Sequence, residues 1–281
     1  GDGWTDLIGK LLFAMEQNPT GDLSPAGIER AVELADFEKM EEIRARVDSI
    51  VKDPKTAEAL KPYYRQFCKR PCFHNEYLET YNRPSVTLVD TQGRGVDRIT
   101  ATGVEVQGRE YELDCLIYAT GFEVGTDYSH RAGIELLGRD GISLTEAWAD
   151  GVRSLHGMHV NGFPNCFIMS NAQAGFTVSY PHLLDEQAKH IAYIIKAASD
   201  KGCVEVEVTE QSETKWVQHC IDKARDAGDF LENCTPGYYN NEGRSGTRNA
   251  QDGFYGGGSI EFFHVLQRWR DEGGFDGLAL K

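Results

Sequence analysis

Apolar residues recur at helical spacing in the segment from about Phe37 to Val51. Charged residues fill the positions between them, which is the pattern of a helix with one buried face. Asp53-Pro54 is expected to stop this helix and to open a short one that ends before Pro62. The apolar positions of the long helix are Phe37, Met40, Ile43, Val47 and Ile50.

Residues 181–199 predict a second long helix. Pro181 suits the first helical position, where no backbone N–H is needed. Further helices are expected over about 210–226 and 259–269. The predicted buried stripe of the helix over 181–199 consists of Leu184, Ala188, Ile191 and Ile195.

Between Val86 and Ala119 the sequence pattern changes from helical spacing to short runs rich in β-branched residues. Glycines at 93, 95, 103 and 108 supply the turns between them, so the tight spacing predicts an antiparallel meander. The apolar end of its last run, Leu113 to Ala119, is expected to enter a buried sheet. The predicted strands are Val86 to Val89, Val96 to Thr100, Val104 to Val106 and Glu110 to Tyr118.

Two stretches show no regular pattern. Residues 1–36 carry Gly and Pro breaks among apolar patches, and the start, Gly-Asp-Gly-Trp, shows no obvious initiating element. Asn233 to Gly258 is rich in Gly, Asn and Tyr and predicts a long ordered loop. A long loop without secondary structure of its own is often functional.

Composition excludes several classes of partner and site. The net charge of −15 argues against nucleic acid or an anionic membrane as partner, because both need a basic face. No apolar run approaches the roughly 18 residues of a spanning helix, and the N-terminus lacks the order of a signal peptide. No C-x-x-C spacing occurs among the seven cysteines, which favours thiols in the cytoplasm and no metal site.

The strongest local signal is the segment Asp114 to Phe122, in which an apolar run ends in Ala119, Thr120 and Gly121. Small side chains at the carboxyl end of a buried strand let the backbone approach a ligand. Spacing alone leaves a second interpretation open, a tight turn that binds nothing.

This segment resembles the Ala-Thr-Gly motif of flavin-containing and Baeyer–Villiger monooxygenases. Three further segments, in the same order along the chain, are similar to the Baeyer–Villiger branch. They are Lys69-Arg70-Pro71 with Tyr81-Asn82-Arg83-Pro84, Gly162-Phe163-Pro164-Asn165 with Glu186-Gln187, and Asn233 to Arg244 with Gly256-Gly257.

The resemblance implies roles for Lys69 and Arg70. Arg70 would be the catalytic residue beside the reactive flavin edge, because a permanent planar cation stabilises the anions that form when oxygen is transferred to a ketone. Lys69 would contact the 2′-phosphate of NADP. Without the resemblance, such a basic pair is typical of a solvated surface.

The pocket loop, Ser170 to Pro181, is similar to a segment that passes the flavin ring in this family. Asn171 and Ala172, which stand where many members have Gly-Pro, and Pro181 at the following helix start would then contact the cofactor. The alternative is an ordinary loop before a helix. The implied substrate-pocket residues are Phe176, Thr177, Val178 and Tyr180.

The cofactor-covering loop, Thr235 to Arg244, resembles a segment that folds over the nicotinamide cofactor. Asn240 and Arg244 are its polar candidates, and Thr235 stands where many members have Trp. A solvated loop is the alternative. The glycines at 256–258 are more consistent with a turn than with a phosphate cradle.

No G-x-G-x-x-G fingerprint occurs in the chain, although the family carries one for FAD and one for NADP. The chain is therefore expected to be a piece of a longer polypeptide, with the N-terminal half as its missing partner. The expected fold is α/β, part of a flavoprotein with two dinucleotide-binding domains, with an antiparallel meander and a helical portion. Residues 1–68 are assigned to the helical part of the NADP-side lobe and 69–281 to the FAD-binding domain.

The complete enzyme is expected to use NADPH, FAD and O₂ to insert one oxygen atom beside a ketone carbonyl, giving an ester or lactone. Two alternatives stay open at this point. One is an N- or S-oxidising flavin monooxygenase, and the other is a non-catalytic module derived from such an enzyme.

Overall fold

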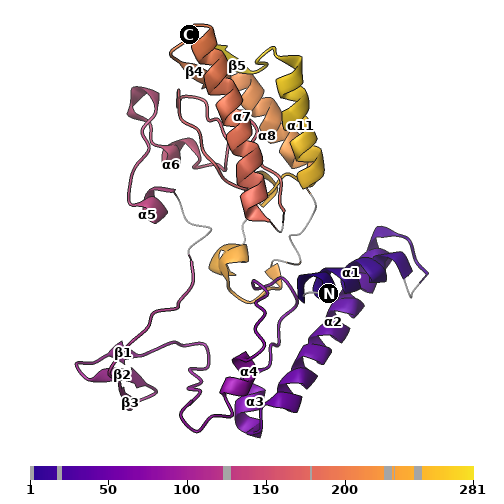
Figure 1. Ribbon diagram of the computed structural model, residues 1–281, viewed down its shortest axis with the longest axis vertical. Helices are drawn as coiled ribbons and strands as arrows, with labels where there is room; N and C mark the ends of the chain where they lie inside the picture. The colour runs from indigo at the N-terminus through magenta and orange to yellow at the C-terminus, as the bar shows by residue number, and fades with distance from the viewer. Residues whose placement is uncertain are drawn as a thin grey trace. The chain divides into compact units, whose positions relative to one another are not determined.

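The computed structural model describes residues 3–17, 21–122, 128–177, 179–224, 230, 232–243 and 249–281. The chain divides into two compact units, Gly1–Phe122 and Glu123–Lys281 (Figure 1). Each unit is α/β in composition, with helices and one small antiparallel sheet. The predicted domain boundary after residue 68 refers to the complete protein and stays a prediction.

The first unit begins with two helices that the sequence pattern did not predict in full. Helix α1 covers Gly3–Gln17 and packs on α2, which covers Pro25–Ile50. The prediction that this helix begins near Phe37 was wrong, and so was the interpretation that no element begins at the start of the chain, because α1 begins at Gly3. Ser24 caps α2 by accepting a hydrogen bond from the Gly27 N–H, and Pro25 occupies the first turn.

The end of α2 agrees with the sequence. Helix α3, Pro54–Leu60, begins after Asp53, whose carboxylate accepts a hydrogen bond from the Thr56 N–H at 2.8 Å. Val47, Val51 and Ala57 form a small core between α2 and α3. The short helix α4 covers Tyr77–Thr80.

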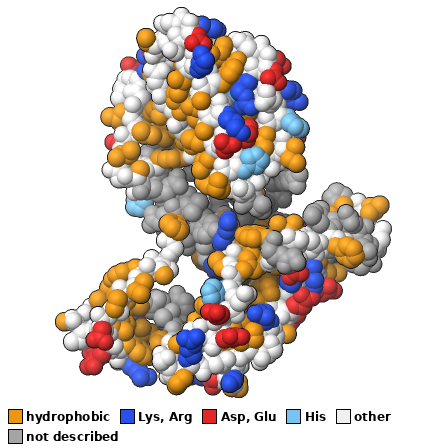
Figure 2. Space-filling model, viewed as in Figure 1, with side chains coloured by type: hydrophobic (Ala, Val, Ile, Leu, Met, Phe, Trp, Pro, Cys, Tyr) orange, Lys and Arg blue, Asp and Glu red, His pale blue; other side chains and the backbone are white. Residues whose placement is uncertain are grey.

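The predicted meander is confirmed as an antiparallel sheet of three strands, β1 (Arg98–Ile99), β2 (Gly103–Val106) and β3 (Arg109–Glu112). One prediction around it was wrong, because residues 86–89 form no strand. A second is not met within this chain, because 113–119 leave the sheet as exposed irregular chain, with Ile117 82% exposed. Hydrophobic side chains therefore lie on the surface around this sheet (Figure 2).

The exposure of 113–119 has a simple cause. An apolar run becomes a buried strand only when strands on both sides take up its N–H and C=O groups. In the part of the chain that the structure describes, no strand lies beside it.

The second unit is built around three helices that lie side by side, α7 (Tyr180–Asp200), α8 (Glu210–Lys223) and α11 (Ser259–Glu272) (Figure 1). All three were predicted, with small errors at their ends. Strands β4 (Val206–Val208) and β5 (Leu278–Leu280) pair antiparallel beside them. The shorter elements are α5 (Tyr128–Ala132), η1 (Arg139–Gly141), α6 (Leu144–Ala147), η2 (Tyr238–Gly243) and α10 (Asn249–Asp252).

The predicted buried stripe of α7 was wrong by about one position. Ala188 and Ile195 are exposed, whereas the buried side includes the polar residues Gln187 and His190. Apolar periodicity misses a stripe of this kind because two of its members are polar. The residues of the observed stripe are Leu183, Gln187, His190, Ile194 and Ala198.

The main core of this unit joins the three helices to the loops before them. Phe262 and Leu266 of α11 are fully buried in it. Gly256 illustrates how close the packing is, because a Cβ atom there would lie 1.9 Å from the carbonyl oxygen of Lys223. The other buried members are Leu155, Met158, Ala174, Leu183, Val208, Trp216, Cys220 and Tyr255.

Candidate functional site

Lys69 and Arg70 lie in the first unit, in the irregular segment between α3 and α4. The guanidinium carbon of Arg70 lies 5.2 Å from the ring centre of Trp4 on α1, and the side chain is exposed. The ammonium nitrogen of Lys69 lies 5.8 Å from the ring centre of Tyr64. Each cation is therefore held on an aromatic face, which restrains the position of its charge.

Ala119, Thr120 and Gly121 form exposed irregular chain at the end of the first unit. Gly121 has a φ of +94°, a conformation that glycine adopts readily, and no atom lies within 4 Å of a Cβ placed there. The motif thus presents open backbone, as a ligand contact requires.

The pocket loop lies in the second unit and is tightly held at its start. The Ala172 N–H donates to the Ser170 hydroxyl at 3.2 Å, and the buried side chain of Gln187 donates to the Ser170 carbonyl at 2.7 Å. Asn171 and Ala172 are both half-buried.

The second half of the pocket loop is more open. The Phe176 ring lies 4.5 Å from the Phe254 ring, centre to centre, and both rings are partly exposed. Thr177 accepts a hydrogen bond from the Ser179 N–H, and Tyr180 and Pro181 begin α7 with exposed side chains. Phe176 and Tyr180 are thus exposed and Thr177 is half-buried, whereas Val178 lies outside the described residues.

Asn240 organises the cofactor-covering loop from inside. It is 4% exposed, and its amide oxygen accepts hydrogen bonds from the N–H groups of Gly237 and Gly243 at 3.0 and 3.1 Å. Its amide nitrogen donates to the carbonyl of Cys234. Both ends of the amide are engaged within the loop, so the geometry supports a structural role. Arg244 lies outside the described residues.

Sequence reasoning missed a cluster of three buried histidines, His156, His159 and His190. The ring of His190 lies 5.4 Å from that of His156 and 6.3 Å from that of His159, centre to centre. Burial lowers the pKa of His156 to about 3, that of His159 to about 4 and that of His190 to about 2. The rings therefore stay neutral at physiological pH and pack as core, against Trp216 and Trp269.

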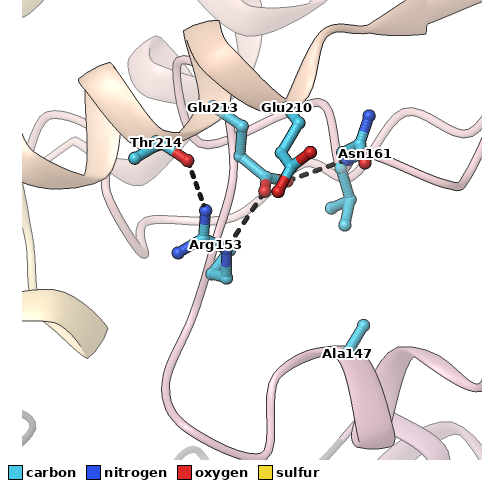
Figure 3. A pocket seen from close by; sticks show the side chains of 7 residues that line it. Ala147, Arg153, Asn161, Glu210, Glu213 and Thr214 are labelled. Carbon is cyan, nitrogen blue, oxygen red and sulfur yellow. Dashed lines mark hydrogen bonds and ion pairs between the residues drawn. The ribbon is translucent and has the colours of Figure 1, made fainter.

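A second missed group lines an open pocket of about 470 Å³ in the same unit (Figure 3). The buried carboxylate of Glu213 accepts from Arg153 at 3.1 Å and from the Asn161 N–H at 2.8 Å, and Arg153 also donates to Thr214. None of the residues predicted from the sequence lines this pocket. Its remaining lining residues are Ala147, Val160 and Glu210.

Two further observations concern metals and membranes. Within the described ranges, no three His, Cys, Asp or Glu side chains are placed to hold a metal ion. None of the helices in the described part of the chain is long and apolar enough to cross a membrane.

Known sequences decide the family. The chain is 54% identical over 284 residues to pentalenolactone D synthase of Streptomyces exfoliatus, covering 100% of this chain and 48% of that protein. It is 44% identical over 280 residues to a Baeyer–Villiger monooxygenase of Stachybotrys chlorohalonatus, covering 99% of this chain and 45% of that protein. Over its whole length the chain is similar to the C-terminal half of Baeyer–Villiger monooxygenases. It spans about half the length of the curated relatives it matches, and no protein-family model matches it.

Solved structures agree with this Baeyer–Villiger assignment. A polycyclic ketone monooxygenase from the fungus Thermothelomyces thermophila superposes with a TM-score of 0.84 at 36% identity, over 100% of this chain and 46% of that one. An oxidised steroid monooxygenase bound to NADP superposes with a TM-score of 0.71 at 26% identity, over 88% of this chain and 45% of the other. The fold is thus that of part of a flavin monooxygenase.

Some of the Baeyer–Villiger motif residues have structural roles. The Asn82 side chain bonds the carbonyl of Ile50 and the N–H of Lys52, which fixes the end of α2. The Asn165 side chain bonds Val204 and Val206 and so holds β4. Some residues of the motifs that indicated the family therefore stabilise the local fold.

Proposed function

We propose that the complete protein is an NADPH- and FAD-dependent monooxygenase that inserts one oxygen atom of O₂ beside a ketone carbonyl, giving an ester or lactone. The observation that carries this proposal is the match of the whole chain, at 54% identity, to pentalenolactone D synthase. The polycyclic ketone and steroid monooxygenases named among the structural neighbours support a cyclic or polycyclic ketone as the substrate class.

The residues of this chain fit FAD as one of the cofactors. Exposed apolar side chains precede the open backbone of Ala119, Thr120 and Gly121. Such a run fits a strand of the FAD-binding sheet whose neighbours belong to an N-terminal portion carrying the dinucleotide fingerprints. The half-buried Asn171 and Ala172 of the pocket loop would face the flavin ring. FAD, reduced by NADPH, supplies the activation of O₂.

Arg70 stabilises negative charge on the reacting oxygen atoms in this proposal. Its guanidinium is permanently charged, offers several N–H donors in a fixed plane, and is restrained by the indole ring of Trp4. Addition of an oxygen nucleophile to a ketone places negative charge on the former carbonyl oxygen. A donor that is already oriented stabilises this charge without reorganising during the reaction.

Lys69 and the pocket loop have separate tasks. Lys69 would neutralise the 2′-phosphate of NADPH, since a compact ammonium suits a phosphate dianion. Phe176, Thr177, Val178 and Tyr180 would form the wall that holds the ketone. Pro181 at the start of α7 would orient the helix N-terminus toward the electron-rich edge of the ring. Asn240 shapes the cofactor-covering loop from which Arg244 would reach NADPH.

An Arg70→Ala variant of the full-length protein tests this assignment. We expect ester formation to fall on the order of a hundredfold or more, because a preorganised donor to a developing anion is lost. Reduction of FAD by NADPH should stay within about twofold of the wild-type rate. Arg109→Ala is the matched control, since Arg109 also lies over an aromatic ring, that of Tyr111, at 4.8 Å. Near wild-type ester formation by Arg70→Ala would show that Arg70 is not the catalytic cation.

A further inference from the structure

One side chain, Gln173, fixes the start of the pocket loop. It is 0% exposed, and its amide oxygen accepts a hydrogen bond from the Ser154 hydroxyl at 2.7 Å. Its amide nitrogen donates to two carbonyl oxygens, that of Val152 at 2.6 Å and that of Gln251 at 3.0 Å. A single amide thus joins the pocket loop to the segment before it and to α10, which follows the cofactor-covering loop.

The backbone of Gln173 makes two more connections. Its N–H donates to the Gly253 carbonyl at 2.8 Å, and its carbonyl accepts from the indole N–H of Trp216 on α8 at 3.2 Å. The next residue continues the contact, because the Ala174 carbonyl accepts from the Tyr255 N–H. The loop is thereby held on several sides at its fourth and fifth residues, Gln173 and Ala174.

An outer layer supports this arrangement. Arg153, which lies between the Gln173 partners Val152 and Ser154, is anchored to α8 through Glu213 and Thr214 (Figure 3). Trp216 is carried by the same helix. The polar network around the pocket therefore joins two segments that contact Gln173, which are residues 152–154 and helix α8.

The backbone at Gln173 adopts a conformation that is unfavourable for a residue with a side chain. Its φ is +54°, a region that residues with a side chain occupy rarely and that glycine enters readily. A non-glycine residue persists in such a conformation only when its surroundings fix it. The buried hydrogen bonds of the Gln173 amide provide that fixation.

We propose that Gln173 is a positioning residue for the reaction. It sets where Phe176, Thr177 and Tyr180 stand, and thus the orientation in which the ketone meets the oxygenating cofactor. Gln173 acts through the loop and not by touching the substrate. The proposal rests on the proposed function, because it assigns the pocket loop to the substrate.

The test uses the full-length enzyme and an unsymmetrical cyclic ketone, which can give two regioisomeric lactones. Gln173→Met keeps the length of the side chain but removes its amide, and Gln173→Gly removes the side chain while accepting the positive φ. Gln218→Met, an exposed glutamine of α8 bonded to Asp222, is the matched control. The readouts are the lactone ratio, the lactone formed per NADPH consumed, and the rate of FAD reduction.

In both Gln173 variants, we expect the lactone formed per NADPH to fall about tenfold and the lactone ratio to change, because a misplacement of about 1 Å can cost up to about a hundredfold in rate. FAD reduction should stay within about twofold of wild type. Lower yield of folded enzyme changes neither ratio, so a merely structural role would leave both unchanged. If both ratios match wild type in the variant that folds, the positioning role is wrong. If the wild-type enzyme itself forms no lactone from any ketone, the proposed function fails first.

Discussion

At the residue scale, Lys69 and Arg70 are adjacent but are expected to do different chemistry. Each cation rests on its own aromatic ring, Tyr64 for Lys69 and Trp4 for Arg70. Two charges fixed on separate rings can serve two ligands, so each can be removed without displacing the other. Effects on cofactor choice and on oxygen transfer should therefore separate in mutants.

Lys69→Ala tests the cofactor half of this division. The 2′-phosphate is the only difference between NADPH and NADH, and a hydrogen bond to a charged group contributes roughly 1.5–3 kcal/mol. We expect the KM for NADPH to rise about tenfold or more while the KM for NADH hardly changes. Steady-state kinetics with both cofactors measures this, with the exposed Lys55→Ala as control. An unchanged ratio of the two KM values would leave Lys69 with no part in cofactor choice.

The buried histidines predict a pH dependence of stability. Their folded-state pKa values, about 2 to 4, lie below the ordinary value of 6.5. Between these pKa values and pH 6.5, the unfolded chain therefore binds more protons than the folded chain does. The free energy of unfolding is highest above about pH 6.5 and falls as the pH drops toward 4, by up to about 1.4 kcal/mol per pH unit for each histidine.

His156→Phe should reduce this pH slope by about a third, since one of three titrating groups is lost. Chemical unfolding followed by tryptophan fluorescence between pH 4.5 and 7 measures the slope, because Trp216 and Trp269 contact the cluster. The exposed His264→Phe on α11 should leave the slope as in wild type. A wild-type free energy that is flat across this range would contradict the neutral, buried state of the cluster.

Sequence reasoning at the residue scale reached the residues that a family motif marks. It proposed Arg70 through resemblance, and the Ala119-Thr120-Gly121 segment from its small side chains together with resemblance, and the roles of these residues stay predictions. It did not single out Gln173, Glu213 or the three histidines. Those side chains are defined by partners far along the chain, as in the bond from Gln173 to Gln251. Periodicity carries no information on such pairs, and a positive φ at a glutamine leaves no trace in the sequence.

At the element scale, apolar spacing located α7, α8, α11, the second half of α2 and the meander, but it missed α1 and did not settle the ends or the buried faces of the helices it located. Helix α2 begins at Pro25 because a Ser-Pro cap outweighs the Gly27 that reads as a break. The buried face of α7 contains Gln187 and His190, which no apolar pattern can assign. The run over 113–119 has the composition of a buried strand, but strand formation depends on neighbours that lie elsewhere.

Helix α11 gives an energetic test at this scale. Phe262 is fully buried against Trp216 and Tyr255, whereas Ile260 on the same helix is 71% exposed. We expect Phe262→Ala to lower the free energy of unfolding by about 3–5 kcal/mol, because transfer and cavity terms add. Ile260→Ala should change it by less than about 1 kcal/mol. Denaturant titration measures both, and equal losses would show that α11 does not bury the face described.

At the scale of the whole molecule, the proposed cofactor contacts of this chain are to the flavin ring and the nicotinamide cofactor, and the chain carries no G-x-G-x-x-G loop for a pyrophosphate. We therefore expect the isolated 281-residue chain to purify without flavin. An absorbance spectrum of the purified chain measures this, with the full-length protein as the control that should be yellow. A stoichiometric flavin band in the isolated chain would show that the ring contacts alone suffice.

The most direct measurement of the central claim is product analysis of the full-length protein with ¹⁸O₂, NADPH and a panel of cyclic and polycyclic ketones. The account predicts an ester or lactone in which the ring oxygen carries the label, formed as NADPH is consumed. Oxidation of NADPH that yields hydrogen peroxide with every ketone, or oxygenation of a sulfide or amine alone, would contradict it.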